Sequence, residues 1–244
     1  NAGSIAFRDS AFEFKNHSLG NTQLWAGSQI TNTSSAPLTF TFTKISTTDP
    51  KQNIDLYAGN AITMYGDVTF KHDDADDHTG FIKLRANANE ENLWNELSLT
   101  DLVQLPGLGR CPAQCVYSGP GDIDLRANTT ILYKGKPTVW MAANNDINIR
   151  QNYLHVAGSI TQADQGPTRI VAGRDIITGA NTTNHPNNYL TTSFFYNHVG
   201  KGDKGHFDMK AGRNIITNNK VTLGYSQNSQ KVHTTLFACS DIDI

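Results

Sequence analysis

The densest group of side chains able to bind a metal ion is the acidic run His72–His78. Asp73, Asp74, Asp76 and Asp77 offer the carboxylate oxygens that a hard cation such as Ca²⁺ prefers. The run lacks EF-hand spacing, a central glycine and a closing glutamate, so a solvated acidic loop is the simpler interpretation. We therefore predict no metal site and no cofactor, with these four aspartates as the alternative.

Aromatic side chains form the second group with recognition chemistry. Successive side chains of a strand point to opposite faces, so a run of aromatics cannot be buried on one side only. Aromatic residues are also enriched at recognition hot spots. The predicted partner-binding residues are Trp94, Tyr117, Tyr189, Phe194, Phe195 and Tyr196. The alternative for all of them is packing: a helix carrying Trp94 folded flat on the protein, and the later aromatics covering its flank.

Carboxylates also raise the question of catalysis, because cleavage of a glycosidic bond needs two of them at a set separation. Charged residues in the polar places of alternating segments could stack on one face: Asp55, Asp124 and Asp208, with Arg85, Arg126 and Lys210 beside them. Such a charged row usually makes a surface soluble. The chain also lacks a Gly-x-Ser-x-Gly nucleophile elbow. We predict that the protein is not an enzyme, with a polysaccharide lyase or hydrolase as the alternative.

The elements that must position these residues are short strands joined by small-residue corners. One phrase recurs, in which alternating apolar residues lead to Ala, then Gly or Asn, and shortly afterwards Ile. Its copies lie at 24–30, 56–62, 123–131, 139–147, 170–176, 207–215 and 237–242, with weaker ones at 2–5, 82–87 and 156–160. Stacked copies place Ala on Ala and Ile on Ile about 4.8 Å apart. The phrase predicts an all-β chain with the fold of a parallel β-solenoid, and a β-sandwich is the alternative.

Composition limits the partners. The 244 residues are 38% hydrophobic and 17% charged, with a net charge of −2. Such a chain lacks the basic surface of a nucleic-acid-binding protein, and no apolar run is long enough to insert into a membrane. The alternating stretch Ser240–Ile244 at the end favours a segment excised from a longer protein.

Two stretches interrupt the repeats and are predicted insertions, at about 87–120 and 179–206. Within the first, Leu93, Trp94 and Leu97 have near-helical spacing, which predicts a short helix that ends before Pro106. Insertions carry binding functions in repetitive folds, because the repeat itself only needs to stack.

The stretches Val171–Ile176 and Lys210–Ile215 resemble the haemagglutinin-type repeats of filamentous exoproteins that Gram-negative bacteria secrete by the two-partner route. The resemblance implies a right-handed parallel β-helix, here a single domain over 1–244, displayed at the cell surface. It also implies an outer-membrane transporter as the export partner of the parent protein. In an exported protein we expect a disulfide between Cys111 and Cys115, and Cys239 takes the corner place of a buried small residue.

We therefore predict a monomeric, non-enzymatic binding segment of a secreted cell-surface filament, which engages a target-cell surface protein or glycan. One alternative is the receptor-binding region of a contact-dependent growth inhibition effector, which would recognise an outer-membrane protein of a neighbouring bacterium. Some members of the resembled family are glycosylated at Asn-x-Ser/Thr sequons, which occur here at Asn16, Asn32, Asn128 and Asn181.

Overall fold

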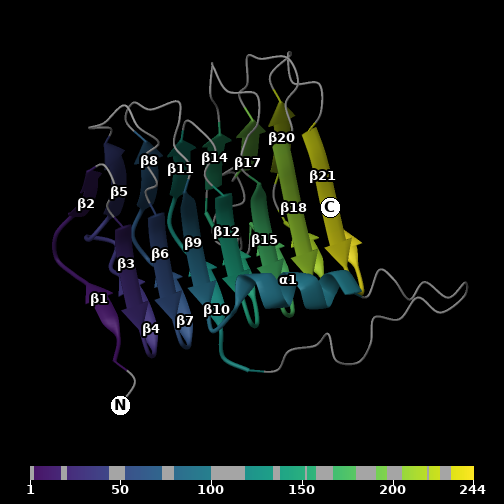
Figure 1. The fold of residues 1–244 in the computed structure, drawn as a ribbon, viewed down its shortest axis with the longest axis horizontal. Helices are drawn as coiled ribbons and strands as arrows, with labels where there is room; N and C mark the ends of the chain where they lie inside the picture. The colour runs from purple at the N-terminus through teal and green to yellow at the C-terminus, as the bar shows by residue number, and fades with distance from the viewer. Residues whose placement is uncertain are drawn as a thin grey trace, which may run out of the picture.

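A computed structural model describes most of the chain. The described residues are 3–17, 21–43, 53–72, 80–99, 119–133, 138–151, 153–157, 167–179, 191–196, 205–218, 220–225 and 232–244. They form three β-sheets, and a single helix among the described residues, α1 (Glu90–Leu99), lies across one of the sheets (Figure 1). The described part of the chain is therefore all-β apart from this helix.

The strands fall into three sheets, which we name A, B and C. Sheet A contains β1 (Ile5–Phe7), β4 (Gln29–Asn32), β7 (Ala61–Met64), β10 (Asp122–Leu125), β13 (Ile147–Ile149), β16 (Ile176–Thr178), β19 (Ile215–Thr217) and β22 (Ile242–Asp243). Sheet B contains β2 (Phe12–His17), β5 (Leu38–Thr43), β8 (Val68–His72), β11 (Thr129–Tyr133), β14 (Tyr153–Ala157), β17 (Thr191–Tyr196) and β20 (Lys220–Tyr225). Sheet C contains β3 (Asn21–Ala26), β6 (Asn53–Ala58), β9 (Phe81–Ala86), β12 (Thr138–Ala143), β15 (Thr168–Ala172), β18 (Gly205–Ala211) and β21 (Val232–Ala238).

The chain visits the three sheets in rotation, so each strand pairs with the third strand before and after it in sequence. Every strand pair within the described residues is parallel. The alternative of a β-sandwich built from antiparallel strands is therefore wrong.

The small-residue corners are in register, as the repeated phrase predicts. In sheet C the aligned alanines are Ala26, Ala58, Ala86, Ala143, Ala172, Ala211 and Ala238. In sheet A the aligned isoleucines are Ile5, Ile30, Ile62, Ile123, Ile147, Ile176, Ile215 and Ile242. After each strand of sheet C from β6 onward, the next N–H donates to the alanine carbonyl of the neighbouring strand before it, as from Gly173 to Ala143 at 3.0 Å. The corners thus extend the hydrogen-bond ladder of the sheet.

Two copies of the phrase do not occupy this corner. In the copy at 123–131 the first strand is β10 of sheet A and the second is β11 of sheet B. The copy at 156–160 begins in β14, which belongs to sheet B. Both errors have one cause: Ala followed by a small residue also suits other corners, and the phrase does not encode which sheet precedes it.

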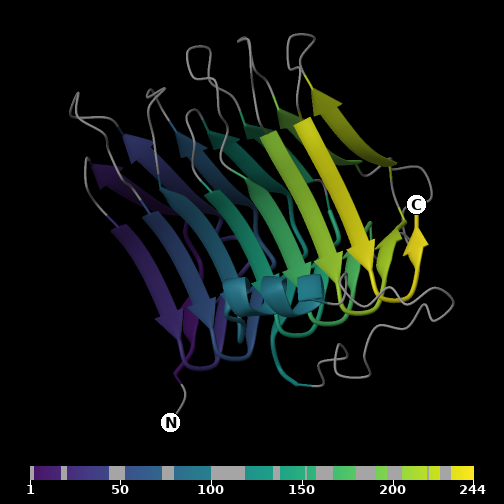
Figure 2. The same cartoon turned by 45° about the vertical axis from the view of Figure 1, so that its right-hand side comes forward.

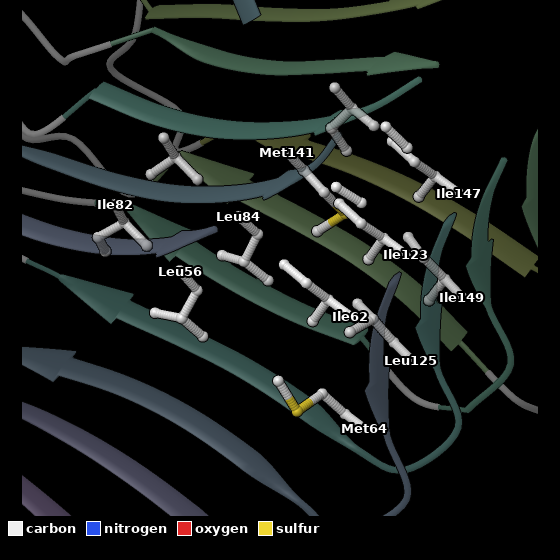
Figure 3. Close-up of a cluster of buried hydrophobic side chains, with 14 of the residues drawn as sticks. Leu56, Ile62, Met64, Ile82, Leu84, Ile123, Leu125, Met141, Ile147 and Ile149 are labelled. Atoms are coloured by element: carbon white, nitrogen blue, oxygen red, sulfur yellow. The ribbon is translucent and has the colours of Figure 1, made fainter. Parts of the chain in front are cut away.

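The core lies between the sheets and consists of side chains from alternate strand positions. Figure 3 shows Leu56, Leu84 and Met141 of sheet C turned toward Ile62 and Ile123 of sheet A. All five are at most 1% exposed. Apolar burial of this kind supplies most of the stabilisation, and it explains why the alternating pattern could be recognised in sequence.

Sheet B contributes a column of phenylalanines to the same core. Phe14, Phe40 and Phe70 are aligned on β2, β5 and β8. Their rings stack almost in parallel, with centroids 4.9 Å apart between Phe14 and Phe40 and 5.0 Å apart between Phe40 and Phe70. Leu38 and Phe40 are both fully buried, so alternate residues of β5 face this core.

Charged ladders reinforce the corners between sheets C and A. The guanidinium of Arg213 binds both carboxylate oxygens of Asp175, through Nε at 2.8 Å and through Nη2. The Asn214 N–H donates to the same carboxylate at 3.1 Å. Arg174 and the Asp175 N–H repeat both interactions on Asp146. In the repeated sequence Ala-Gly-Arg-Asp/Asn-Ile, the arginine of one corner therefore binds the aspartate carboxylate of the corner before.

Removing one carboxylate from this ladder should be measurable. We expect Asp175→Ala to lower the free energy of unfolding by about 1–2 kcal/mol, a value reduced because Arg213 is partly exposed. Asp241→Ala is the matched control, because Asp241 holds the equivalent corner position but is exposed, and it should change stability by less than about 0.5 kcal/mol. Urea unfolding of both variants measures the difference.

The effect of Asp175→Ala should depend on pH. Burial raises the pKa of Asp175, but the hydrogen bond and charge of Arg213 outweigh it, so the pKa lies below the usual 3.8. The stabilisation is therefore present above the usual pKa and is lost as pH falls through the lower folded-state value. The difference between wild type and Asp175→Ala should be full at about pH 7 and small at about pH 2. An unchanged difference would contradict the ionic origin.

The connections between sheets differ in their lengths. From sheet B to sheet C, β2 ends at His17 and β3 begins at Asn21, whereas β14 ends at Ala157 and β15 begins only at Thr168. From sheet C to sheet A, β18 ends at Ala211 and β19 begins at Ile215. Apart from the stretch between β9 and β10, the corners from C to A remain this short.

The two predicted insertions have different outcomes. The first lies between Ala86 of β9 and Asp122 of β10, and the predicted short helix is α1. The second is divided, because β17 pairs with β14 and β20 as an ordinary strand of sheet B. Residues 197–204 lie outside the described residues. Within the described part of the chain, no helix is long and apolar enough to cross a membrane.

Candidate functional site

Helix α1 covers part of the outer face of sheet C. It begins at Glu90 because the Asn89 side chain caps it, accepting a hydrogen bond from the Asn92 N–H at 3.0 Å. Its buried Leu93 and Leu97 pack with outward side chains of β12 and β15, which are Trp140, Ala142 and Val171. Figure 2 shows the helix lying across the ends of these strands. The helix therefore divides sheet C into a covered part and an open part.

Trp94 lies between α1 and the sheet. Its ring meets the Trp140 ring edge-on at 5.6 Å, and the Lys210 ammonium lies 4.1 Å from the ring centroid. The Arg169 guanidinium lies 5.1 Å from both tryptophan rings. Trp94 therefore packs against sheet C, as the alternative to partner binding expects, and its binding of a partner stays a prediction.

The N-terminal end of α1 is fixed by charge. The Glu90 carboxylate binds the Lys83 ammonium and lies 3.4 Å from Arg85 Nη1. Burial raises the pKa of Glu90, but the hydrogen bond and charge of Lys83 and the charge of Arg85 lower it further, so the pKa lies below its usual value. Glu90 is therefore ionised at neutral pH and links the helix to strand β9.

The open face of sheet C is formed by the outward residues of β3, β6 and β9. In register they are Asn21, Gln23 and Trp25, then Asn53, Asp55 and Tyr57, then Phe81, Lys83 and Arg85. We use the name "open face" for these nine residues. Amide, carboxylate, guanidinium and aromatic residues thus lie side by side on neighbouring strands. Strands β3, β6 and β9 lie to one side of the helix (Figure 1).

Asp55 organises the open face. Its buried carboxylate accepts hydrogen bonds from Arg85 Nε at 3.0 Å, from Arg85 Nη2 at 2.5 Å and from Trp25 Nε1 at 3.2 Å. Arg85 in turn reaches Glu90. A buried carboxylate is costly unless it is paired and hydrogen-bonded, and here every bond also fixes an outward group.

Two aromatic rings project from this network. Trp25 is 62% exposed although its indole N–H is bonded to Asp55. The Trp25 and Tyr57 ring centroids are 6.2 Å apart and inclined by 59°, and the Arg85 guanidinium lies 5.3 Å from the Tyr57 centroid. The open face thus presents a held indole ring to solvent, which suits recognition.

The same geometry does not suit a general acid. Asp55 and Glu90 share Arg85, and a general acid needs a raised pKa, whereas the pKa of Glu90 is lowered. The predicted row of aspartates is also wrong in part: Asp55 and Asp208 lie in sheet C, but Asp124 lies in sheet A and binds Arg126 and Arg150.

The other predicted site residues have no described side chains. Phe194, Phe195 and Tyr196 lie in β17 and pair with Leu223, Gly224 and Tyr225, but only their backbone is described. Outside the described residues lie Tyr117, Tyr189, Cys111, Cys115, Asp73, Asp74, Asp76 and Asp77. Among the side chains that are described, no three acidic, histidine or cysteine residues gather in a way that would hold a metal ion.

Cys239 differs from its expected role as a buried small residue. It is half-buried, packs against the cluster under α1 and forms a disulfide. The predicted bond between Cys111 and Cys115 stays a prediction, because both residues lie outside the described residues.

Sequence reasoning missed Trp25 and Tyr57 as site residues, because both lie inside copies of the repeated phrase. The available signal is their position: each occupies the slot directly before the corner alanine, as does Arg85. That slot points outward, so a large aromatic there is not explained by the core.

Comparisons with family models, with curated proteins and with solved structures give no match for this chain. The resemblance to haemagglutinin-type repeats therefore rests on the residues quoted above.

Proposed function

We propose that the chain is a segment of a right-handed parallel β-helix within a large secreted filament on a bacterial cell surface. The rotation of successive strands through three sheets, with alanines and isoleucines aligned, supports a chain that winds in one direction. The right hand follows from the strong general preference of parallel crossover connections. The resemblance of Val171–Ile176 and Lys210–Ile215 to haemagglutinin-type repeats supports export through an outer-membrane transporter.

Within that filament, the segment acts as a monomer that binds a target-cell surface and does not catalyse a reaction. One observation carries this proposal: the open face of sheet C presents Trp25, held by the buried Asp55, on a rigid sheet. The carboxylates at this site are ion-paired, which favours binding over glycoside cleavage.

Binding of the labelled chain to surfaces tests the proposal. We expect saturable attachment either to intact bacterial outer membranes or to host epithelial cells, and none by the heat-unfolded chain. We expect no unsaturated or reducing-end products when the chain is incubated with acidic polysaccharides. Attachment to bacterial membranes alone would assign the segment to receptor recognition in contact-dependent growth inhibition. Product formation, or no attachment to either surface, would overturn the proposal.

A further inference from the structure

We propose that the open face of sheet C binds a neutral glycan, with one sugar ring stacked on the indole of Trp25. The inference rests on the proposed binding function and names its ligand class and its residues. The Trp25 ring is exposed: 62% of the residue remains accessible, so no described side chain covers it from the solvent side.

The exposed Trp25 ring determines the shape of the ligand that fits. An aromatic face carries partial negative charge and attracts the polarised C–H groups on one side of a pyranose ring. Tyr57 stands beside Trp25 at an inclination of 59°, so the two rings contact a ligand in different planes. A sugar, with an apolar face and a polar rim, fits a ring that is bordered by polar groups.

Amide side chains border the Trp25 ring. Gln23 is exposed two residues before Trp25 on the same face, and the amides of Asn21 and Asn53 are joined by a hydrogen bond of 2.9 Å. Asn53 Oδ1 also accepts the Phe81 N–H at 3.1 Å. Planar amide groups both donate and accept, which is what vicinal hydroxyl groups require of their partners.

The charged groups at the site balance one another. The four charged groups at the site, Asp55, Lys83, Arg85 and Glu90, are paired with one another. Two are acidic and two are basic, so their formal charges cancel. A uronate or sialylated glycan would find no unpaired cation among these residues, and a neutral glycan requires none.

The Trp25 side chain is held in position before a ligand binds. Trp25 is tied to Asp55 by its indole N–H, and Asp55 is held by two bonds from Arg85. An exposed side chain that is already oriented loses little conformational entropy when a ligand binds. This tether distinguishes Trp25 from an aromatic residue that is merely exposed.

A protein partner fits the open face less well. A stable protein interface buries about 800 Å² on each side around an apolar core. Among the described residues the exposed large apolar side chains are Trp25, Tyr65, Leu132, Ile242 and Ile244. Only Trp25 of these belongs to the open face, so the apolar contact it offers matches one sugar ring rather than a protein surface.

The test uses an array of neutral oligosaccharides ending in hexose or N-acetylhexosamine, printed beside uronate-containing ones, followed by calorimetric titration of the best neutral ligand. We expect Trp25→Ala to weaken its binding at least about tenfold and Trp25→Phe to weaken it by only about threefold. Tyr65→Ala is the matched control, since Tyr65 is also exposed but lies just after β7 of sheet A. It should bind like the wild type.

The outcomes separate this inference from the proposed function. Undiminished binding by Trp25→Ala, or preference for uronate ligands, would overturn the inference. If the chain binds no glycan but attaches to cells and loses attachment after protease treatment of those cells, the partner is a protein, and only the proposed function stands. If it neither binds glycans nor attaches to cells, both fall. Circular dichroism of each variant shows whether the fold is intact.

Discussion

Phe40→Ala should lower the free energy of unfolding by about 4 kcal/mol. The Phe40 ring is fully buried and stacks on both sides, against Phe14 at 4.9 Å and Phe70 at 5.0 Å. Truncation removes both contacts and leaves a cavity that neighbouring strands cannot fill, because their backbones are fixed by the sheet. Urea unfolding followed by far-UV circular dichroism gives the value, with the midpoint reported beside it.

Two further variants serve as comparisons for Phe40→Ala. Phe40→Leu keeps most of the volume, and we expect it to cost about 1–2 kcal/mol. Thr39→Ala changes the preceding residue, which is not buried, and should shift stability by less than about 0.5 kcal/mol. A loss below about 1 kcal/mol for Phe40→Ala would show that the phenylalanine column does not form the core of sheet B.

The second large effect is expected at Gly121, where the chain re-enters the stack before β10. This residue has φ of 135°, which side-chain-bearing residues rarely adopt. An added Cβ would lie 2.7 Å from the Ala86 carbonyl oxygen and 2.7 Å from Asn144 Cβ. Both neighbours belong to adjacent corners and are held by the backbone ladder. We expect Gly121→Ala to cost about 3 kcal/mol, from strain and overlap together.

Gly119 provides the matched control two residues earlier. A Cβ there would meet only the Asn144 side-chain nitrogen, at 3.3 Å. Gly119→Ala should therefore leave the thermal midpoint nearly unchanged, whereas Gly121→Ala should lower it by several degrees. Equal midpoints for the two variants would contradict the close approach of Gly121 to the neighbouring corners.

Sequence reasoning could predict the alignment of strands in sheets A and C because two residue types mark it. Alanine ends each strand of sheet C, where a larger side chain would not fit inside the corner, and isoleucine begins most strands of sheet A. Sheet B lacks such a mark. The residue type changes along one aligned column, from Phe40 and Phe70 to Ile131 and His155. As a result the sequence predicts an insertion over 179–206, whereas the structure pairs β17 with β14 and β20 in sheet B.

The candidate site was harder to predict for a different physical reason. Stacking constrains only the inward positions, so the outward slots of β3, β6 and β9 vary freely, and nothing in one strand indicates its neighbour. The open face exists because β3, β6 and β9 place Trp25, Tyr57 and Arg85 in adjacent strands. Asp55 reaches Arg85 across 30 positions in sequence. Only the register brings these groups together, and it had to be known first.

The unequal connections between the sheets indicate where this protein accommodates additional residues. Alignment of sheet C is the same whether few residues, as between His17 and Asn21, or many, as between Ala157 and Thr168, precede a strand. One edge of the molecule therefore accommodates connections of different length, whereas the described corners from sheet C to sheet A, such as that from Ala211 to Ile215, are short. Residues added along the first edge would change the surface of the protein and leave its stacked scaffold unaltered.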